Sequence, residues 1–374
     1  MKACIVTIED FKNYGNRLQN YALDRILKKH GIEVVNGLYV KTLADWTYST
    51  NSKKRLLAKA VPFFMHKLRF KYNDYKAESK RDDLTKQRIK KFKEFSDRYV
   101  TTLPHYYVKN DEMLRKQIGD EEIDYYITGS DQVWNPYFAG YDYDFISFAD
   151  RKKRFSFAAS IGVDEIPNKD VDRYKKNLKE MNFISVREAQ AAGLVKKLSG
   201  RDAEVFLDPT LCLDVEEWRN IEEKPSIDLP EKYIATYFLG DTPEQVKKYA
   251  QDNNYQLVEM NNKAYKDLFT INPGEFLYVI DNSDMMITDS FHAVVFSILF
   301  KKQFMVFYRS QKGVKSMSSR IDNILSIFNL TNQIQSEDTD IKSHVIDKEK
   351  YDEVHNILND YKTRQLEMFL ESLK

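Results

Sequence analysis

The chain has 374 residues, 42% of them hydrophobic and 13% aromatic, which is enough to bury a sizeable core and to form two domains. Its 58 Lys and Arg residues nearly balance 57 Asp and Glu residues, and a net charge of +1 argues against a nucleic-acid partner. Two cysteines occur far apart, Cys4 and Cys212, which excludes a disulfide framework and a CxxC metal or redox site.

The first apolar run, residues 3–8, is too short for the core of a signal peptide. No other apolar run approaches the roughly 20 residues that a membrane-spanning helix needs. We therefore expect a cytoplasmic protein.

The first half of the sequence alternates between strand and helix patterns. A β-branched run at 4–8 is followed by a helical pattern that Gly31 ends, and by a second strand at 32–35. Further strands are expected at 123–128, 154–159, 183–186 and 204–207, with a helix at 189–198. This order predicts an α/β domain with a parallel sheet over residues 1–213.

A basic segment interrupts this domain at about residues 44–99. Residues 51–100 hold 16 Lys and Arg against 6 Asp and Glu, and the cations are interleaved with Leu57, Val61, Phe64 and Leu68. We interpret the segment as a helical insert that packs its apolar side on the domain. The alternative is contact with the anionic inner surface of the membrane or with a lipid-linked substrate.

The second half repeats the pattern. Strands are expected at 233–238, 256–259, 285–288 and 304–307, and helices at 243–250, from 273, and at 292–299. We therefore expect a second doubly wound domain over residues 229–335 and a helix within 345–374 that packs back across a domain. Because ligands of open parallel sheets bind at the carboxyl ends of the strands, the two domains are expected to face a shared cleft.

A polar turn joins a buried strand to a buried helix within residues 285–296 and contains Asp289, Ser290 and His292. The start of the helix offers unpaired amide groups to an anion. Of the six histidines, His292 alone lies in such a turn, and an imidazole can transfer protons near neutral pH. The alternative is that Asp289 or Ser290 caps the helix and that His292 is a satisfied first-turn residue.

The run 125–136 has the same form and delivers a polar cluster after a strand. Gly129 allows close approach of the backbone to a ligand, and Ser130, Asp131 and Gln132 supply hydrogen-bonding groups. Trp134 can cover the apolar face of a sugar ring, so the run is similar to a sugar-binding lining, with a plain turn as the alternative.

Arg187 directly follows the strand expected at 183–186. A structural role there needs a buried partner such as Glu188, whereas a functional role is to hold a phosphate or a carboxylate. Further cations follow the last strand of the second half and either reach the same edge or remain surface charges: Arg309, Lys312, Lys315 and Arg320.

Several common signatures are absent from the sequence, namely GxxxxGK[ST], GxGxxG, HExxH and GxSxG. The sequence therefore lacks the usual motifs for chemistry with ATP, NAD or zinc. We infer a transferase with an anion-binding cleft around His292, and we expect no metal.

Five motifs occur in order over roughly residues 1–330: Asn13-Tyr14-Gly15-Asn16 with Leu18-Gln19, the run from Gly129 to Asn135, Ser185-Val186-Arg187-Glu188, Leu207-Asp208-Pro209-Thr210, and Thr288-Asp289-Ser290-Phe291-His292. In their order and spacing they resemble the polysaccharide pyruvyl transferase family. The resemblance implies two tandem Rossmann-like domains of the glycosyltransferase-B type.

The same resemblance implies an activity: pyruvate is transferred from phosphoenolpyruvate to two hydroxyls of a sugar, a ketal forms and phosphate is released, in the biosynthesis of an exopolysaccharide, capsule or cell-wall glycan. No cofactor besides phosphoenolpyruvate is implied, and the sugar acceptor can be lipid-linked. His292 matches the family's histidine and is expected to act as acid, base or both. Arg187 matches its arginine and is expected to hold phosphoenolpyruvate, while Asn13, Gly15 and Asn16 are expected to line the substrate site.

The last motif departs from some relatives, which carry Arg-Leu-His where this chain has Ser290-Phe291-His292. Either Arg309 or Arg320 is expected to replace that cation, or the substrate anion relies on backbone amides and the Ser290 hydroxyl. Two rival functions stay open: a nucleotide-sugar glycosyltransferase of the same architecture, and a non-catalytic sugar-binding component of a polysaccharide assembly complex.

Overall fold

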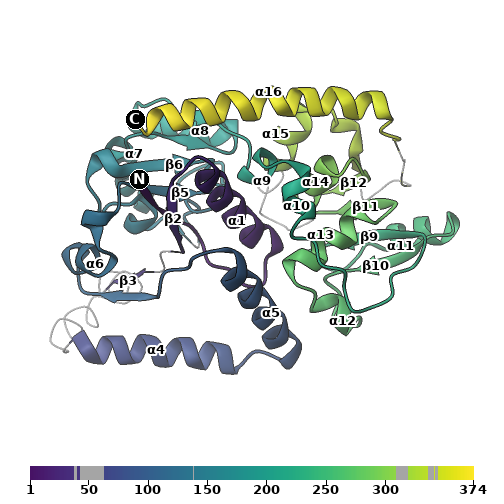
Figure 1. Ribbon diagram of the computed structural model, residues 1–374, viewed down its shortest axis with the longest axis horizontal. Helices are drawn as coiled ribbons and strands as arrows, with labels where there is room; N and C mark the ends of the chain where they lie inside the picture. The colour runs from purple at the N-terminus through teal and green to yellow at the C-terminus, as the bar shows by residue number, and fades with distance from the viewer. Residues whose placement is uncertain (38–39, 43–62, 138, 309–318, 336–340, 342–343) are drawn as a thin grey trace.

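The computed structural model describes all residues except 38–39, 43–62, 138, 309–318, 336–340 and 342–343. Its two larger sheets are parallel, one formed by the first half of the chain and one by the second, and helices cover both (Figure 1). The expected α/β class with two doubly wound sheets is therefore confirmed. None of the helices that the structure describes combines the length and the hydropathy needed to span a lipid bilayer.

The first sheet has the strand order β2-β1-β5-β6, with β1 at Lys2–Val6, β2 at Glu33–Asn36, β5 at Tyr125–Gly129 and β6 at Arg154–Phe157. All four strands are parallel, and Cys4 lies opposite Val35 on one side and Tyr126 on the other. Isolated bridges extend the sheet toward the pair β7 (Ser185–Val186) and β8 (Glu204–Val205). The strand order reverses direction between β1 and β5, so loops after these two strands diverge and leave a crevice where ligands of such sheets bind.

The second sheet has the order β10-β9-β11-β12-β13 and is also parallel throughout. Its strands are β9 (Tyr233–Tyr237), β10 (Gln256–Glu259), β11 (Met285–Thr288), β12 (Gln303–Phe307) and β13 (Ile334–Gln335). Here the order reverses between β9 and β11. The turn that carries His292 therefore lies at the carboxyl edge beside the reversal point of this sheet.

Helices α1 (Tyr14–Lys29), α13 (Pro273–Asp281) and α14 (Phe291–Leu299) join the two halves. Every residue of α14 is buried, which explains why its sequence is apolar all round. Tyr14 stacks on Phe276 at a ring distance of 4.2 Å and donates a hydrogen bond to the carbonyl of Ile271 at 3.1 Å. The start of α1 is thus held against the second half of the chain.

The remaining helices complete the layers. The α-helices are α4 (Phe63–Ser79), α5 (Asp83–Tyr99), α6 (Asp111–Ile118), α7 (Val171–Glu180), α8 (Ala189–Ser199), α9 (Pro209–Cys212), α10 (Val215–Arg219), α11 (Glu244–Asp252), α12 (Lys266–Phe269) and α15 (Ser319–Ile327). Short 3-10 turns occur at Asp120–Glu122, Asp142–Phe145, Arg151–Lys153, Asn168–Asp170 and Thr331–Gln333.

Helix α16 (Lys348–Ser372) packs back across the molecule, as expected, and lies along both halves (Figure 1). Near its start, Nε2 of His355 lies 3.0 Å from the carbonyl of Ile298 in the second half. Near its end, Phe369 packs edge-on against Phe157 at 5.0 Å, and Gln365 accepts a hydrogen bond from the amide of Leu207 at 2.8 Å.

The basic insert is helical where the structure describes it. In α5 the residues Ile89, Phe92 and Phe95 are buried, so this helix packs its apolar side on the molecule as expected. Helix α4 differs, because its apolar residues Leu68 and Tyr72 are each 60% exposed. The remaining part of the insert, including Leu57 and Val61, lies outside the described residues.

Two predictions of secondary structure were incomplete. A short parallel pair of strands, β3 (Val40–Thr42) and β4 (Tyr106–Val108), flanks the insert and was not expected. The strands predicted to reach residues 8, 159 and 207 end earlier, at Val6, Phe157 and Val205, because the chain turns into loops that carry polar groups. The residues beyond these strand ends form much of the site described next.

Candidate active site

Polar side chains from both halves meet in a buried cluster between the carboxyl edges of the two sheets. We call it the charge cluster; its members are Ser130, Asp131, Arg187, Asp208, His292 and Arg320, each 9% exposed or less. Ser130 and Asp131 follow β5, Arg187 follows β7, Asp208 follows β8, His292 lies in the first turn of α14, and Arg320 lies in the first turn of α15, Ser319–Ile327. Five separate elements therefore position one constellation.

Arg187 and Asp208 form the centre of the charge cluster. Nη2 of Arg187 lies 2.6 Å from Oδ2 of Asp208, with both side chains at most 2% exposed. Ser130 Oγ donates to the same carboxylate oxygen at 3.0 Å and accepts from Nη2 of Arg187. Thr210 donates its amide and its hydroxyl to the other oxygen of Asp208, at 2.9 and 2.6 Å. Burial raises the pKa of Asp208, but Arg187, His292 and Thr210 together hold it well below its usual range.

Glu188, the partner suggested for Arg187 by the sequence, binds elsewhere. Its Oε1 accepts hydrogen bonds from the hydroxyl of Ser160 and from the amides of Ile161 and Gly162, at 3.0 to 3.1 Å. Arg187 is therefore paired with a residue 21 positions further on. Its Nε and Nη1 are buried and make no hydrogen bond within the described part of the chain.

His292 crosses from the second half to contact the first. Its Nε2 lies 3.7 Å from Oδ2 of Asp208 and has no hydrogen-bond partner among the described residues. The ring packs on the backbone of Gly15, where an added Cβ would lie 1.9 Å from Nδ1 of His292. Gly15 is thus required for the imidazole to reach the charge cluster.

Asn16 links the charge cluster to the loop between β1 and α1. Its Nδ2 donates to Oδ2 of Asp131 at 2.8 Å, and its Oδ1 accepts from the amide of Asp10 at 3.0 Å. Burial raises the pKa of Asp131, but the charges of Arg187 and His292 and the hydrogen bond from Asn16 lower it below its usual range. Asn13, also in this motif, caps α1 by accepting from the amide of Asn16 at 3.3 Å.

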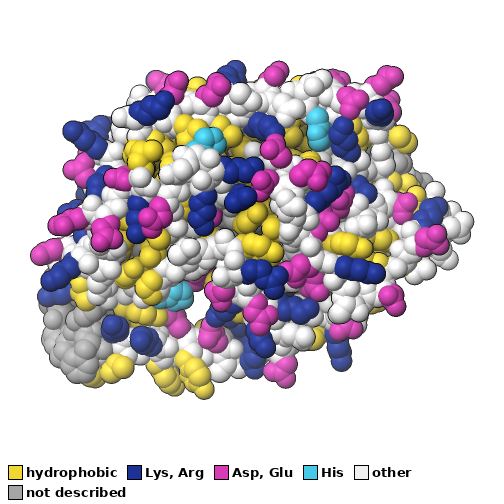
Figure 2. All heavy atoms as spheres, in the orientation of Figure 1, with side chains coloured by type: hydrophobic (Ala, Val, Ile, Leu, Met, Phe, Trp, Pro, Cys, Tyr) yellow, Lys and Arg dark blue, Asp and Glu magenta, His cyan; other side chains and the backbone are white. Residues whose placement is uncertain are grey.

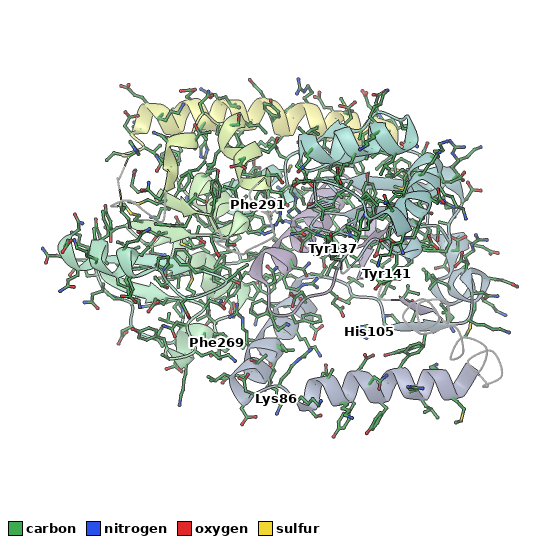
Figure 3. All side chains as sticks on the ribbon, turned by 180° about the vertical axis from the view of Figure 1, so that it is seen from behind. Lys86, His105, Tyr137, Tyr141, Phe269 and Phe291 are labelled. Atoms are coloured by element: carbon green, nitrogen blue, oxygen red, sulfur yellow. The ribbon has the colours of Figure 1, made fainter. Side chains whose placement is uncertain are left out.

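Arg320, at the start of α15, joins the charge cluster from the second half. The amide of Gln132, with its oxygen turned toward this residue, lies 2.7 Å from Nη2 of Arg320. The guanidinium groups of Arg187 and Arg320 lie 5.1 and 5.8 Å from the ring of Phe291, which stands between the two halves in Figure 3. Arg309, the other cation expected to replace the missing arginine, lies outside the described residues.

Three further predicted site residues lie close to the charge cluster but have local partners. Asp289 accepts from the amide of Leu239 at 3.0 Å and so ties the loop after β11 to the loop after β9. Ser290 is the N-cap residue of α14, and its amide donates to Thr288 Oγ1 at 2.9 Å. Gly129 has a φ of 118°, and a Cβ there would lie 2.3 Å from the carbonyl oxygen of Phe157. The backbone of Gly129 therefore lies close to the neighbouring strand β6.

Trp134 does not offer its indole to a ligand, which corrects the prediction of a sugar platform. The ring has no exposed surface, stacks on Phe145 at 5.0 Å and donates its N–H to the carbonyl of Asp144 at 3.1 Å. The sequence pattern could not separate a core indole from a binding one. Three residues later, Tyr137 is 75% exposed, and this is the aromatic surface that the turn presents (Figure 3).

A family model for polysaccharide pyruvyl transferases matches residues 13–311, about four fifths of the chain. The chain belongs to the polysaccharide pyruvyl transferase family. The match covers the charge cluster apart from Arg320, and its first residue is Asn13 at the cap of α1. None of the curated proteins matches this family member in sequence.

Solved structures with little sequence identity share the fold of this pyruvyl transferase family member. UDP-GlcNAc 2-epimerase from Methanocaldococcus jannaschii aligns with a TM-score of 0.51 at 11% identity, over 99% of this chain and 100% of the epimerase. A glycosyltransferase from Rickettsia africae aligns with a TM-score of 0.50 at 10% identity, over 100% of this chain and 98% of that one. The architecture is therefore of the glycosyltransferase-B type.

Sequence reasoning missed two residues of the site. Asp208 is predicted to have no role of its own, although its place in the shared motif Leu207-Asp208-Pro209-Thr210 is a signal for function. Gln19 accepts from the amide of Ser130 at 2.9 Å and donates to Thr7 Oγ1 at 3.0 Å, so it holds the ends of β1 and β5 together. Among the described residues, no group of three or more His, Cys, Asp or Glu side chains is arranged to hold a metal ion.

Proposed function

We propose that this family member transfers pyruvate from phosphoenolpyruvate to two hydroxyls of a sugar, forming a ketal and releasing phosphate. The observation that supports the proposal is the charge cluster, which combines buried cations from both halves with a histidine whose Nε2 is not hydrogen-bonded within the described chain. The reaction needs an anion clamp and a proton donor, and these are the groups that the charge cluster brings together.

Arg187 is the residue proposed to hold phosphoenolpyruvate. One side of its guanidinium is fixed by Asp208, which leaves Nε and Nη1 as donors for a phosphate or carboxylate. The guanidinium of Arg320 lies 5.8 Å from the ring of Phe291, which Arg187 also contacts, and the amides at the start of α14 add a favourable field for an anion. Arg320 thereby supplies the cation that Ser290 does not.

His292 is proposed to move the protons. In the first step it donates a proton to the methylene carbon of phosphoenolpyruvate, and C2 becomes an oxocarbenium-like electrophile that one sugar hydroxyl attacks. The bond from C2 to the phosphate oxygen then breaks, and the second hydroxyl attacks C2 to close the ketal. Of the two protons that the hydroxyls lose, one replaces the proton given by His292 and the other leaves on phosphate. No further cofactor enters this scheme.

The direct test offers the purified chain phosphoenolpyruvate with a panel of free, nucleotide-linked and lipid-linked sugars. We expect phosphate release that depends on the sugar, and a product whose mass has increased by one pyruvyl ketal. Release of a nucleotide from a nucleotide sugar would instead identify a glycosyltransferase. Binding of sugars without turnover would identify a sugar-binding component, and each of these two results contradicts the proposal. The expected setting is the synthesis of an exopolysaccharide, a capsule or a cell-wall glycan.

A further inference from the structure

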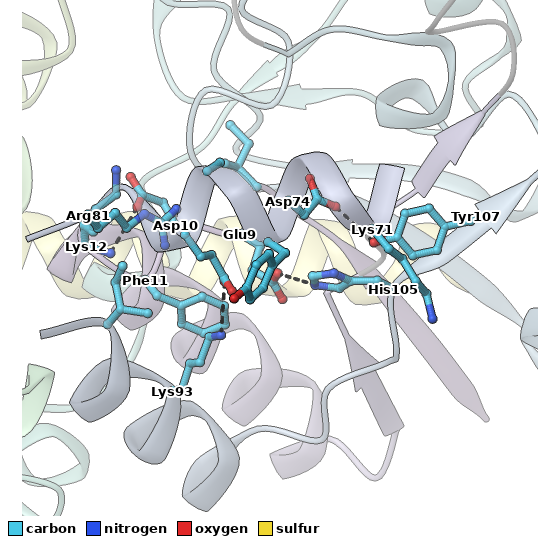
Figure 4. A pocket seen from close by; sticks show the side chains of 15 residues that line it. Glu9, Asp10, Phe11, Lys12, Lys71, Asp74, Arg81, Lys93, His105 and Tyr107 are labelled. Carbon is cyan, nitrogen blue, oxygen red and sulfur yellow. Dashed lines mark hydrogen bonds and ion pairs between the residues drawn. The ribbon is translucent and has the colours of Figure 1, made fainter. Parts of the chain in front are cut away.

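A second pocket, of about 630 Å³, lies outside the charge cluster, between the loop that follows β1 and the helices α4 and α5 (Figure 4). We call it the hairpin pocket, after the hairpin formed by the consecutive helices α4 and α5. The loop contributes Ile8 to Lys12, α4 contributes residues from Lys71 to Glu78, α5 contributes Ile89 and Lys93, and β4 with its preceding loop contributes His105 and Tyr107. No motif in the sequence indicated it, because its walls come from four distant segments.

The carboxylates of the hairpin pocket already have partners. Glu9 lies 2.7 Å from Nε2 of His105, and Asp74 accepts a hydrogen bond from the hydroxyl of Tyr107 at 3.0 Å. Glu78 pairs with Lys93 at 3.8 Å. Asp10 also lines the pocket, and its Oδ1 accepts a hydrogen bond from the backbone amide of Lys12 at 3.0 Å. Among the described residues, none of these four carboxylates lies within ion-pair distance of the side chains of Lys12, Lys71 or Arg81.

Three cations remain at the hairpin pocket: Lys12, Lys71 and Arg81. In the part of the chain that the structure describes, none of the three forms an ion pair. One comes from the β1–α1 loop, one from α4 and one from the turn after it, so they converge on the pocket from different elements. Such a set of cations favours an anionic ligand with several acceptor oxygens, as a phosphate has.

Aromatic rings complete the lining. Phe11, Tyr75 and Tyr107 face the pocket, and Tyr75 is 69% exposed. An exposed ring can cover the apolar face of a pyranose, while polar groups such as the Glu9–His105 pair bind its hydroxyls. The combination of rings, a carboxylate–imidazole pair and unpaired cations fits a sugar that carries a phosphate better than it fits either part alone.

The hairpin pocket is connected to the charge cluster through one loop. The carbonyl of Ile8 accepts from Nη2 of Arg17 at 2.7 Å, and the guanidinium of Arg17 lies 5.0 Å from the ring of Phe11. Asn16, next to Arg17, binds the amide of Asp10 on one side and Asp131 of the charge cluster on the other. A ligand in the hairpin pocket therefore contacts the same loop that positions the proposed reaction site.

We propose that the hairpin pocket binds the acceptor as a glycosyl phosphate, a sugar with a phosphate or diphosphate at its anomeric carbon. The role of this ligand as the acceptor rests on the proposed function, whereas binding of the glycosyl phosphate does not require turnover. Three sources share this chemistry: a free sugar phosphate, a nucleotide sugar and a lipid-linked sugar.

The outer face of α4 bears on the choice among these sources. Met65, Leu68, Tyr72 and Tyr75 recur at intervals of three and four residues, so they form one stripe, and they are 49% to 69% exposed. Figure 2 shows hydrophobic side chains gathered along this edge of the molecule. Because the stripe ends beside the hairpin pocket at Tyr75, it favours the lipid-linked source, whose apolar chain would leave the pocket along it.

The test compares two double variants of the full chain. Lys71→Glu with Arg81→Glu reverses two charges inside the hairpin pocket, and Lys76→Glu with Lys80→Glu reverses two charges on the same hairpin that do not line it. Binding of glucose 1-phosphate, glucose, UDP-glucose and a polyprenyl-linked sugar diphosphate in neutral vesicles is measured by calorimetry. Circular dichroism checks that both variants are folded.

We expect the wild type and the control variant to bind glucose 1-phosphate more tightly than glucose, and the pocket variant to lose about tenfold or more in affinity for it, as loss of charge-assisted contacts predicts. Equal affinities in the two variants, or equal binding of glucose and glucose 1-phosphate by the wild type, would overturn the proposal. Among glucose 1-phosphate, UDP-glucose and the polyprenyl-linked sugar diphosphate, the ligand that binds most tightly identifies the source of the glycosyl phosphate.

The two proposals fail in different ways. If binding follows the variants but no pyruvyl transfer occurs, the proposed function is wrong and the hairpin pocket remains a glycosyl phosphate site. If transfer occurs and the pocket variant has the acceptor KM of the control, the proposed function stands and the hairpin pocket is not the acceptor site.

Discussion

The charge cluster and the hairpin pocket lie on two sides of the β1–α1 loop and are built in opposite ways. In the charge cluster, every ionisable group is buried and Arg187 is paired before any substrate arrives. In the hairpin pocket, Tyr75 is exposed and Lys12, Lys71 and Arg81 lack ion pairs among the described residues. A buried, preorganised set of charges suits chemistry, whereas an open set of cations and rings suits recognition of a variable ligand.

Substitutions in the two regions should therefore have different effects. Changes in the charge cluster should alter turnover and folding stability, because buried charges cannot be replaced by water without cost. Changes in the hairpin pocket should alter the affinity for one substrate and leave stability unchanged.

The largest effect is expected for Asp208→Asn, which removes the carboxylate that forms the buried ion pair with Arg187. Removal of one partner of a buried pair costs about 3–5 kcal/mol, to be measured by urea unfolding at pH 7. The lowered pKa of Asp208 in the folded state gives this cost a pH dependence. The stabilisation is complete above the unfolded pKa of about 3.9 and is lost as the pH falls through the folded value, so wild type and variant should converge in acid.

The matched control for Asp208→Asn is Asp82→Asn, which removes a solvent-exposed partner of Lys263 at 2.8 Å. Its effect on unfolding should be small at every pH, because exposed ion pairs contribute little. A variant of Asp208 as stable as this control would mean that the buried ion pair with Arg187 does not stabilise the fold.

His292→Gln should lower kcat by roughly 10²-fold or more, since a glutamine cannot donate the proton. The apparent affinity for phosphoenolpyruvate should change little, because Arg187 stays in place. His344→Gln, at an exposed position, is the control and should match the wild type. Turnover close to that of the wild type in His292→Gln would remove this residue from the mechanism.

Arg187→Lys should raise the KM for phosphoenolpyruvate by about tenfold, and far more than the KM for the sugar, because an ammonium group can bind Asp208 but cannot also present two fixed donors to an anion. Arg219→Lys, in a surface ion pair with Asp281 at 2.9 Å, serves as the comparison. Equal rises for both substrates with a lower melting temperature would indicate a purely structural arginine.

The smallest effect is expected from salt. Between about 0.1 M and about 1 M salt the screening length falls from about 10 Å to about 3 Å, so the KM of a glycosyl phosphate acceptor should rise about threefold. The KM of phosphoenolpyruvate should rise less, since its proposed contacts are buried. A salt response that is equal for the two substrates would contradict the distinction between the two regions.

The sequence predicted the fold and the centre of the site for the same physical reason. Buried parallel strands are readable as apolar runs, and the polar residues at their carboxyl ends are adjacent to them in sequence. Arg187 and His292 were found in this way, and the structure places them around one carboxylate. Their shared partner Asp208 was not predicted, because pairing between residues from different strands leaves no local pattern.

Other features depended on contacts that no short window contains. The prediction of Trp134 as a ligand platform is wrong, because Phe145 from the following turn buries the indole and a short sequence window does not show this contact. The exposed side of α4 was not predicted, because a repeat of apolar residues indicates a buried face more often than an exposed one. The hairpin pocket needed four segments to be brought together, and only the fold does so.

Helix α16 has a consequence for the order in which the protein can be assembled during its synthesis. Phe369 covers Phe157 and Phe183, which belong to the first half of the chain. The ribosome delivers Phe369 roughly 200 residues after these two rings, which at about 5–20 residues per second means a delay of about 10–40 s. For that interval the first half of the chain lacks the cover that Phe369 provides, so a domain whose strands are made early is completed by a helix that is made much later.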